Sequence, residues 1–294
     1  MLVTAAGLTG CDLTRFTANS TAGLFERASS ASEGMWDYEL AGDALPASIM
    51  QLEGLLRVVP DNEIYLSLLV KAYVAYGYGW VEDEALEADA RGDYLAYEAG
   101  LDRAKLLYLR ARDVAQHQMG LHAEGMDERI RQGLEPFETW LKRNFRDRED
   151  AEMLLWAGYA WGSAINSATN DMALVADLPF ARALVERSVA LDPEYEYAAG
   201  ITFLAVVEAE SLGGDLDKAK VLFDQAIEQT ERRSLLTLLS YAKSYAIKSR
   251  DRDLFVSVLS EVLEAGDIAP ERRLSNILAK RRAERLLRRI NDFF

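Results

Sequence analysis

Apolar residues recur at intervals of three and four along most of the chain, which is the spacing of one buried face of an α-helix. The segment from Leu216 to Ile227 shows this spacing clearly, with apolar residues at positions 216, 219, 222, 223, 226 and 227. No stretch of the sequence alternates with a period of two over the length of a strand. The pattern therefore predicts an all-α fold without a sheet.

The same spacing predicts a series of helices after residue 36. They are expected over residues 45–59, 64–81, 101–119, 130–145, 150–167, 178–191, 194–212, 216–230, 234–248, 254–265 and 270–290. Pro60 and Pro193 each follow an apolar stripe, and proline disfavours continuation of a helix. Gly213 and Gly214 can end one helix, and the Asp215 side chain can accept hydrogen bonds from the first amides of the next.

Two of the expected helices carry a small, a large and a second small residue on one face. The motif occurs as Ala104, Tyr108 and Ala111, and again as Ala219, Phe223 and Ala226. It is typical of the second helix of a tetratricopeptide repeat, in which small residues let two helices approach and the aromatic ring fills the gap. We therefore expect a divergent tetratricopeptide-like α-solenoid of antiparallel helix pairs, whose concave face suits the binding of an extended surface.

Two expected helices contain few charges and approach the length of a membrane span. Residues 64–81 hold Lys71 as their only charge, and residues 153–170 hold none. A span needs about 20 apolar residues, and both segments are shorter and contain polar side chains. We interpret both as buried helices, with a span over residues 64–81 as the alternative. Gly158 and Gly162, four residues apart, are expected to let another helix pack closely.

Aromatic and amide side chains in these two segments are the candidate ligand- or partner-binding residues. They are Tyr73, Tyr76, Tyr78, Trp80, Trp156, Trp161, Asn166 and Asn170. Residues of these types usually belong to a core or to a helix end. The alternative is that those of the first segment line a cavity and those of the second form a cluster that faces a ligand or partner.

The composition is that of a folded, acidic protein. Half of the 294 residues are apolar, 28% are charged, and the formal net charge is −15, which argues against disorder and against nucleic acid as a partner. The charge is uneven, because residues 33–100 hold 14 acidic and 3 basic residues whereas residues 270–290 hold 8 basic and 2 acidic residues. These segments are either solvated helix faces or an acidic surface and a basic end that orient subunits or partners.

Few residues suit catalysis or metal binding. A single cysteine excludes an intramolecular disulfide. His117 and His122 are five residues apart, so on a helix their side chains would point in directions that differ by well over 100°. We therefore expect them at the surface and not at a shared metal site. No glycine-rich phosphate loop is present. We predict a protein without catalytic residues, metal or cofactor, and keep an enzyme as the least favoured hypothesis.

The N-terminal segment ends in Leu8-Thr9-Gly10-Cys11, which resembles the lipobox of bacterial lipoproteins. In that family the cysteine becomes the acylated N-terminus and anchors a soluble domain to a membrane. We interpret residues 1–11 as the remainder of a signal peptide with Cys11 as the lipidation site. Residues 12–35 are then a tether, with or without a short helix at 21–31, and residues 36–294 form the helical domain. An ordinary chain terminus is the alternative.

Six segments, taken in their order and spacing, resemble one family. They are Leu45–Tyr76 with Pro46, Glu53 and Pro60; Tyr108–Asp113; Ala176–Pro179 with Ala190–Pro193; Leu212–Ala219; Arg250–Phe255; and Leu274–Ala283. Together, over residues 36–294, the chain resembles the T component of TRAP transporters, a family of periplasmic tetratricopeptide-like lipoproteins.

This resemblance implies a part in the uptake of small organic acids and similar solutes. It implies docking of the periplasmic solute-binding protein of a TRAP system, and self-association into a homo-oligomer with a trimer as one form. It also implies a pore or cleft in each protomer for small organic or apolar ligands, and a periplasmic location with membrane contact only through the lipid anchor. A general tetratricopeptide scaffold lipoprotein for protein–protein interaction in the cell envelope is the alternative function.

Overall fold

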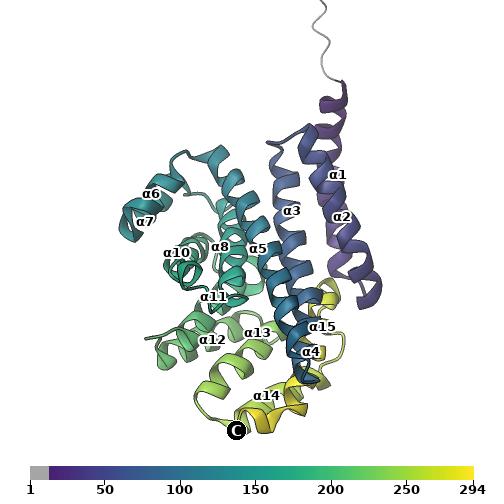
Figure 1. Ribbon diagram of the computed structural model, residues 1–294, viewed down its shortest axis with the longest axis vertical. Coiled ribbons are helices and arrows are strands. Elements are labelled where there is room, and N and C mark those ends of the chain that lie inside the picture. Colours follow the sequence, from purple (N-terminus) through teal and green to yellow (C-terminus); the bar gives the residue numbers. More distant parts are fainter. Residues whose placement is uncertain (1–12) are drawn as a thin grey trace, which may run out of the picture.

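The computed structural model describes residues 13–294, and every regular element in that range is helical (Figure 1). The all-α prediction is confirmed. In chain order the elements are α1 (Leu13–Glu33), α2 (Tyr38–Val58), α3 (Glu63–Tyr76), the π-helical turn η1 (Gly77–Val81), α4 (Glu82–Ala90), α5 (Tyr94–His122), α6 (Met126–Gln132), α7 (Leu134–Asn144), α8 (Asp150–Asn166), α9 (Met172–Val175), α10 (Leu178–Leu191), α11 (Tyr195–Glu210), α12 (Leu216–Gln229), α13 (Leu235–Ser240), the π-helical turn η2 (Tyr241–Ala246), α14 (Arg252–Glu264), η3 (Pro270–Arg272), α15 (Arg273–Arg288) and η4 (Ile290–Asp292).

Several helices begin at a residue whose side chain accepts hydrogen bonds from the first free amides. Asp37 accepts one from the Leu40 amide at 3.0 Å at the start of α2. Asp215 accepts two at the start of α12, from the amides of Asp217 and Lys218 at 2.9 and 3.1 Å. These amides have no partner within their own helix, so the carboxylates stabilise the helix starts. The predicted cap at Asp215 is confirmed.

Helix α2 begins earlier than the expected range of 45–59 and continues through Pro46. Proline lacks a backbone donor and normally disfavours a helix interior. Tyr38 and Ala41 before the proline and Ile49 after it are all buried. Packing along the whole helix therefore outweighs the local cost of the proline. The earlier start was not predicted because a proline is expected near the beginning of a helix and not in its interior.

Residues 130–145, expected as one helix, belong to two. α6 ends at Gln132 and α7 begins at Leu134, and Gly133 between them has a φ of 111°. A residue with a side chain rarely adopts this φ, whereas glycine does so at little cost. The prediction of a continuous helix was wrong because the spacing of apolar residues carries no information on the backbone φ of one glycine between two helices.

Residues 13–33 form α1, where the composition indicated a tether with or without a short helix. Ala18 and Ala22 on one face of α1 are buried, and the Tyr65 hydroxyl of α3 donates a hydrogen bond to the Ala18 carbonyl oxygen at 2.7 Å. Several Ser and Thr hydroxyls of α1 donate to carbonyl oxygens of the preceding turn. The small residues let α1 lie against α2 and α3, which gives this polar segment a packed face.

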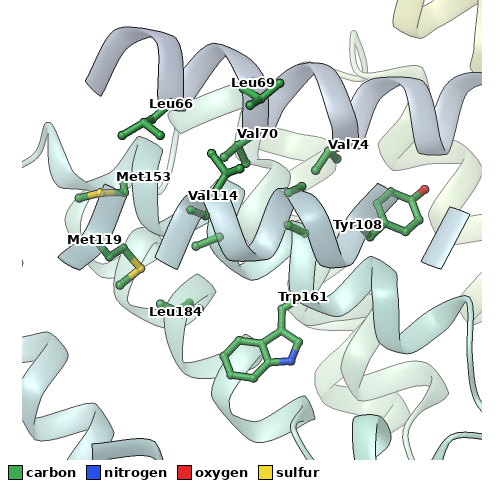
Figure 2. Close-up of a cluster of buried hydrophobic side chains, with 14 of the residues drawn as sticks. Leu66, Leu69, Val70, Val74, Tyr108, Val114, Met119, Met153, Trp161 and Leu184 are labelled. Atoms are coloured by element: carbon green, nitrogen blue, oxygen red, sulfur yellow. The ribbon is translucent and has the colours of Figure 1, made fainter. Parts of the chain in front are cut away.

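The main apolar core lies where α3, α5, α8 and α10 contact one another. Figure 2 shows Leu66, Val70 and Val74 of α3 lying over α5, with Tyr108 and Val114 facing them. The two predicted motifs belong to the interior, with all six of their side chains fully buried: Ala104, Tyr108, Ala111, Ala219, Phe223 and Ala226.

The glycines of α8 allow the close packing that the sequence predicted. A Cβ atom at Gly158 would lie 2.4 Å from Val185 of α10, and one at Gly162 would lie 2.5 Å from Phe203 of α11. Both distances are far below van der Waals contact, so a side chain at either position would force its neighbour to move. At Gly158 the Ala181 carbonyl oxygen, at 3.0 Å, is also in the way, so α8 lies against α10 through a position that favours glycine.

The end of the chain returns to its beginning. A second apolar core joins α11, α12, α13, η2, α14 and α15, and α15 then contacts α1, α2 and α4 (Figure 1). Among the described residues, no helix is both long enough and apolar enough to cross a bilayer.

Candidate functional site

Tyr73, one of the predicted binding residues, is bonded to side chains of neighbouring helices. Its hydroxyl donates a hydrogen bond to Glu53 Oε1 at 2.9 Å, and Glu53 also accepts two hydrogen bonds from Arg110 at 2.8 Å each. The Arg110 hydrogen bonds hold the pKa of the Glu53 carboxyl below its usual range, and burial raises the pKa of the Tyr73 hydroxyl to about 12. These three residues connect α2, α3 and α5.

The other predicted aromatics of this region gather around η1. The Trp80 indole stacks on Tyr38, with ring centroids 5.0 Å apart, and on Tyr76, with centroids 6.3 Å apart. Trp80 Nε1 donates a hydrogen bond to the Tyr38 carbonyl oxygen at 3.2 Å. A Cβ atom at Gly42 would lie 2.2 Å from this nitrogen, so the indole occupies the space above a bare backbone. We call Tyr38, Tyr76, Tyr78 and Trp80 the aromatic stack.

Arginines of α15 cover two rings of the aromatic stack. Arg282 Cζ lies 3.7 Å from the Tyr78 ring centroid, and Arg281 Cζ lies 4.2 Å from the Tyr38 ring centroid. A guanidinium is attracted to the face of an aromatic ring at such distances. Tyr38 was not among the predicted residues because α2 was expected to start after it. The run of basic residues at 270–290 was the sequence feature from which a role of these arginines could have been predicted.

The acidic residues of α4 meet the same arginines in a buried contact that we call the charge seam. It consists of Glu82, Asp83, Glu87, Arg281, Arg282 and Arg285. Asp83 is 3% exposed, Arg285 is 6% exposed, and the two are joined by a salt bridge. Burial and then the Asp83 carboxylate raise the pKa of the neighbouring Tyr38 hydroxyl. At Asp83, Arg282 and Arg285 the acidic and basic segments are therefore not solvated, because the opposite charges are buried against each other.

Trp156 belongs to a second polar group, formed by residues of α1, α3, α8, α11 and η3. We call it the polar cluster, and it consists of Glu33, Lys71, Glu152, Trp156, Tyr195, Glu196 and Arg272. Lys71 Nζ lies 2.6 Å from Glu152 Oε1, and Trp156 Nε1 donates a hydrogen bond to the Tyr195 hydroxyl at 3.3 Å. The Lys71 and Glu152 side chains are 32% and 40% exposed, so solvent reaches this pair.

Electrostatics in the polar cluster depend on close, opposite charges. Burial alone would raise the pKa of the Glu152 carboxyl, but the Lys71 ammonium and its hydrogen bond lower it overall. Burial and then the Glu196 charge raise the pKa of the Glu33 carboxyl. Lys71 was visible in the sequence as the only charge of its apolar segment, whereas no pattern marked Tyr195 as a neighbour of Trp156.

The start of α11 has an unusual backbone beside this cluster. Glu196, Tyr197 and Ala198 have φ values of 51°, 56° and 54°, in the left-handed region that residues with side chains rarely adopt. Arg272 Nη1 donates a hydrogen bond to Glu196 Oε1, and its Cζ lies 4.3 Å from the Tyr197 ring centroid. The Tyr197 hydroxyl donates to Glu271 Oε1 at 2.9 Å. These contacts hold the turn against η3.

The remaining predicted residues lie elsewhere. Trp161 is 3% exposed in the main core, where it stacks on Phe180 with centroids 6.1 Å apart. Asn166, at the end of α8, and Asn170, in the turn that follows, are exposed. Cys11 lies outside the described residues.

Two open hollows lie along α12 and α14, away from the predicted residues. Their volumes are about 510 and 600 Å³, and both are lined by Glu231, Arg232 and Ser257. Neither is lined by a residue of the aromatic stack or the polar cluster.

The histidines of the described region contact carboxylates. His117 Nε2 lies 3.1 Å from Asp61 Oδ1, and His122 Nε2 lies 3.0 Å from Glu63 Oε2. Within residues 13–294 there is no group of three or more His, Cys, Asp or Glu side chains that could hold a metal ion.

Comparison with known proteins places this all-helical chain in a family. No curated protein matches it. The family model of the TRAP transporter T-component matches residues 35–294, which include every helix from α2 to the C-terminus. The chain therefore belongs to the TRAP transporter T-component family and is a component of a TRAP transport system.

Proposed function

We propose that the protein is a non-catalytic, periplasmic component of a TRAP system that docks the system's solute-binding protein. The family match over residues 35–294 is the observation that carries this proposal. In it, Cys11 is acylated and provides the only membrane attachment. The helices form a divergent tetratricopeptide-like solenoid, and the protein assembles into a homo-oligomer, with a trimer as one form.

The polar cluster supports a role in holding a small organic ligand. It combines the aromatic surfaces of Trp156 and Tyr195 with the ammonium of Lys71, and the latter is partly open to solvent. A ligand carboxylate could replace Glu152 as the partner of Lys71, since charge-assisted hydrogen bonds to carboxylates are strong. An apolar ligand body would then pack on the rings. The exposed Asn166 and Asn170 are proposed to face the solute-binding protein.

Co-purification from native envelopes tests the docking part of the proposal. Full-length protein should capture a solute-binding protein of a TRAP system, identified by mass spectrometry, and an Asn166→Ala/Asn170→Ala variant should capture less. Asn144→Ala, at the end of α7, is a matched control, because Asn144 is also exposed. Capture of envelope-assembly proteins in place of a solute-binding protein would contradict the docking role and favour the scaffold alternative.

Ligand binding is tested separately at the polar cluster. Trp156→Phe removes the indole N–H and keeps an aromatic ring, and Lys71→Met removes the ammonium and keeps an apolar stem. If the cluster holds an organic acid, Lys71→Met should weaken binding of a panel of small carboxylates by about tenfold or more in calorimetry, while circular dichroism stays unchanged. Unchanged binding of a carboxylate by a folded Lys71→Met protein would refute this site.

A further inference from the structure

The outward face of α1 carries three large apolar side chains, with the small polar Thr17 and Ser20 between them. Leu13, Phe16 and Leu24 are 72%, 67% and 67% exposed. With about 100° of rotation per residue, all three lie on the side of the helix opposite Ala18 and Ala22, the buried alanines. Between residues 13 and 25 the sequence has one charge, on Arg15. This is an unusual surface in a chain with a net charge of −15.

The position of this face within the molecule narrows what can cover it. The N-terminal turn of α1 lies at one end of the longest axis, beyond the other helices (Figure 1). Arg15 Nε donates a hydrogen bond to the Val58 carbonyl oxygen at 3.1 Å, and Asn62 Nδ2 donates to Asn19 Oδ1 at 2.9 Å. These bonds fix the first turns of α1 to the loop between α2 and α3, so the exposed rings and methyl groups are held at the tip.

Sequence distance connects the tip to the proposed anchor. Asp12 alone separates Cys11 from Leu13, so the two Cα atoms can be at most about 7 Å apart. An acyl-bearing Cys11 would lie at the surface of the bilayer, and the first turn of α1 would then lie within the thickness of the headgroup layer. Apolar helix residues commonly enter a bilayer interface by about 5–10 Å.

We propose that Leu13 and Phe16 form a hydrophobic foot that enters the bilayer interface beside the acylated cysteine. The inference rests on the proposed lipid anchor at Cys11. Leu24 is 11 residues beyond Leu13, about 16 Å further along the helix axis, so it stays outside the bilayer when α1 stands steeply on the membrane. Anchor and foot together hold the protein end-on, with the polar cluster and the seam directed away from the membrane.

The single cysteine of the chain makes a site-specific test possible. Acylation would convert the Cys11 sulfur to a thioether, so a cysteine introduced by Phe16→Cys or by Leu24→Cys can be labelled alone with an environment-sensitive fluorophore. The full acylated chain is placed in phosphatidylethanolamine–phosphatidylglycerol vesicles. The label at position 16 should shift to the blue and be quenched by lipids that carry a spin label in the upper acyl chain. The label at position 24, equally exposed in the protein, should show neither effect.

A second measurement uses charge in place of a label. Leu13→Glu/Phe16→Glu should speed transfer of the acylated protein between vesicles by about tenfold or more, whereas Leu24→Glu should change it by about twofold or less. Both variants should keep the wild-type circular dichroism, because the substituted side chains are exposed.

Failure of the foot and failure of the anchor give different results. If Cys11 is acylated by mass spectrometry but positions 16 and 24 give the same emission and quenching, the foot is wrong and the anchor stands. If Cys11 is unmodified in the native host, the anchor is wrong. The foot is then tested with the Cys11→Ser/Phe16→Cys chain, labelled at position 16 and mixed with an excess of vesicles. The absence of a blue shift from this label would overturn the foot.

Discussion

The main core and the charge seam join helices by different interactions. In the core, α3, α5, α8 and α10 contact one another through apolar side chains such as Leu69 and Leu154, both fully buried. In the seam, α4 and α15 contact one another through Asp83 and Arg285, which are 3% and 6% exposed. Both interfaces have a buried centre, but only the seam places full charges there, which must be paired inside the protein.

The two kinds of interface join different parts of the chain. The helices of the core all lie between residues 63 and 191 and contact one another through repeated apolar stripes. The seam joins residues 202 positions apart, and its two most buried opposite charges, Asp83 and Arg285, pair with each other. A buried charge tolerates few partners, so the seam specifies where the C-terminal helix lies more narrowly than an apolar contact would.

The largest effect is expected from removal of one charge of the seam. Asp83→Ala removes the most buried carboxylate partner of Arg285 and leaves it only the partly exposed Glu87, 3.2 Å away. Loss of one partner of a buried ion pair costs about 4 kcal/mol. The free energy of unfolding, measured by urea denaturation, should fall by that amount. Glu284→Ala on the exposed side of α15 is the matched control, and its free energy of unfolding should change little. A loss of less than about 1 kcal/mol for Asp83→Ala would show that the seam does not hold the ends together.

A core substitution should cost somewhat less. Leu154→Ala removes a fully buried side chain of α8, and such truncations cost about 3 kcal/mol through lost apolar contact and the remaining cavity. The free energy of unfolding in urea measures it, with Leu95→Ala on the exposed start of α5 as the control. Equal stability of the Leu154→Ala protein and the wild type would mean that this region is loosely packed, and the contrast with the seam would disappear.

The partly exposed ion pair between Glu53 and Arg110 should contribute less stability than the buried seam or the core, and its contribution should depend on pH. The pKa of Glu53 is lowered by Arg110, so its stabilising effect is present above the unfolded pKa of about 4.3 and is lost as pH falls through the folded pKa. Glu53→Gln should lower the free energy of unfolding by about 1 kcal/mol at pH 7. The difference from the wild type should shrink as denaturation is repeated down to about pH 3. A difference independent of pH would exclude the charge of Glu53 as the cause.

The smallest effect is expected at the surface. Lys220 Nζ lies 2.7 Å from Asp224 Oδ2, one turn further along α12, with both side chains about half exposed. Exposed pairs of this kind contribute about 0.5 kcal/mol or less. Lys220→Ala should therefore leave the thermal midpoint nearly unchanged. A large drop in the thermal midpoint would show that exposed ion pairs contribute substantially to the stability of this protein.

Much of the fold could be predicted from the sequence because local rules act over one or two turns. Apolar spacing located most helices, and Asp215 was recognised as a cap. The same rules failed at Gly133 and Pro46, where one residue's backbone and distant packing decided the outcome. They also undervalued residues 13–33, whose Ser and Thr content hid the buried face formed by Ala18 and Ala22.

The sites depended more on tertiary structure. Composition marked Trp156 and Trp161 equally, yet one lies in the partly open polar cluster and the other in the core. The basic run of α15 was visible, but its position against Asp83 was not, because charge patterns do not identify their partners across 200 residues.

The sequence by itself determined the helical class, the places where most helices start and stop, and the family, since each depends on neighbouring residues or on their order. Only the tertiary structure decided which charges are buried together and which aromatic rings remain open to solvent. The physical reason is that burial depends on which helix covers a side chain, and that covering helix is supplied by a distant part of the chain.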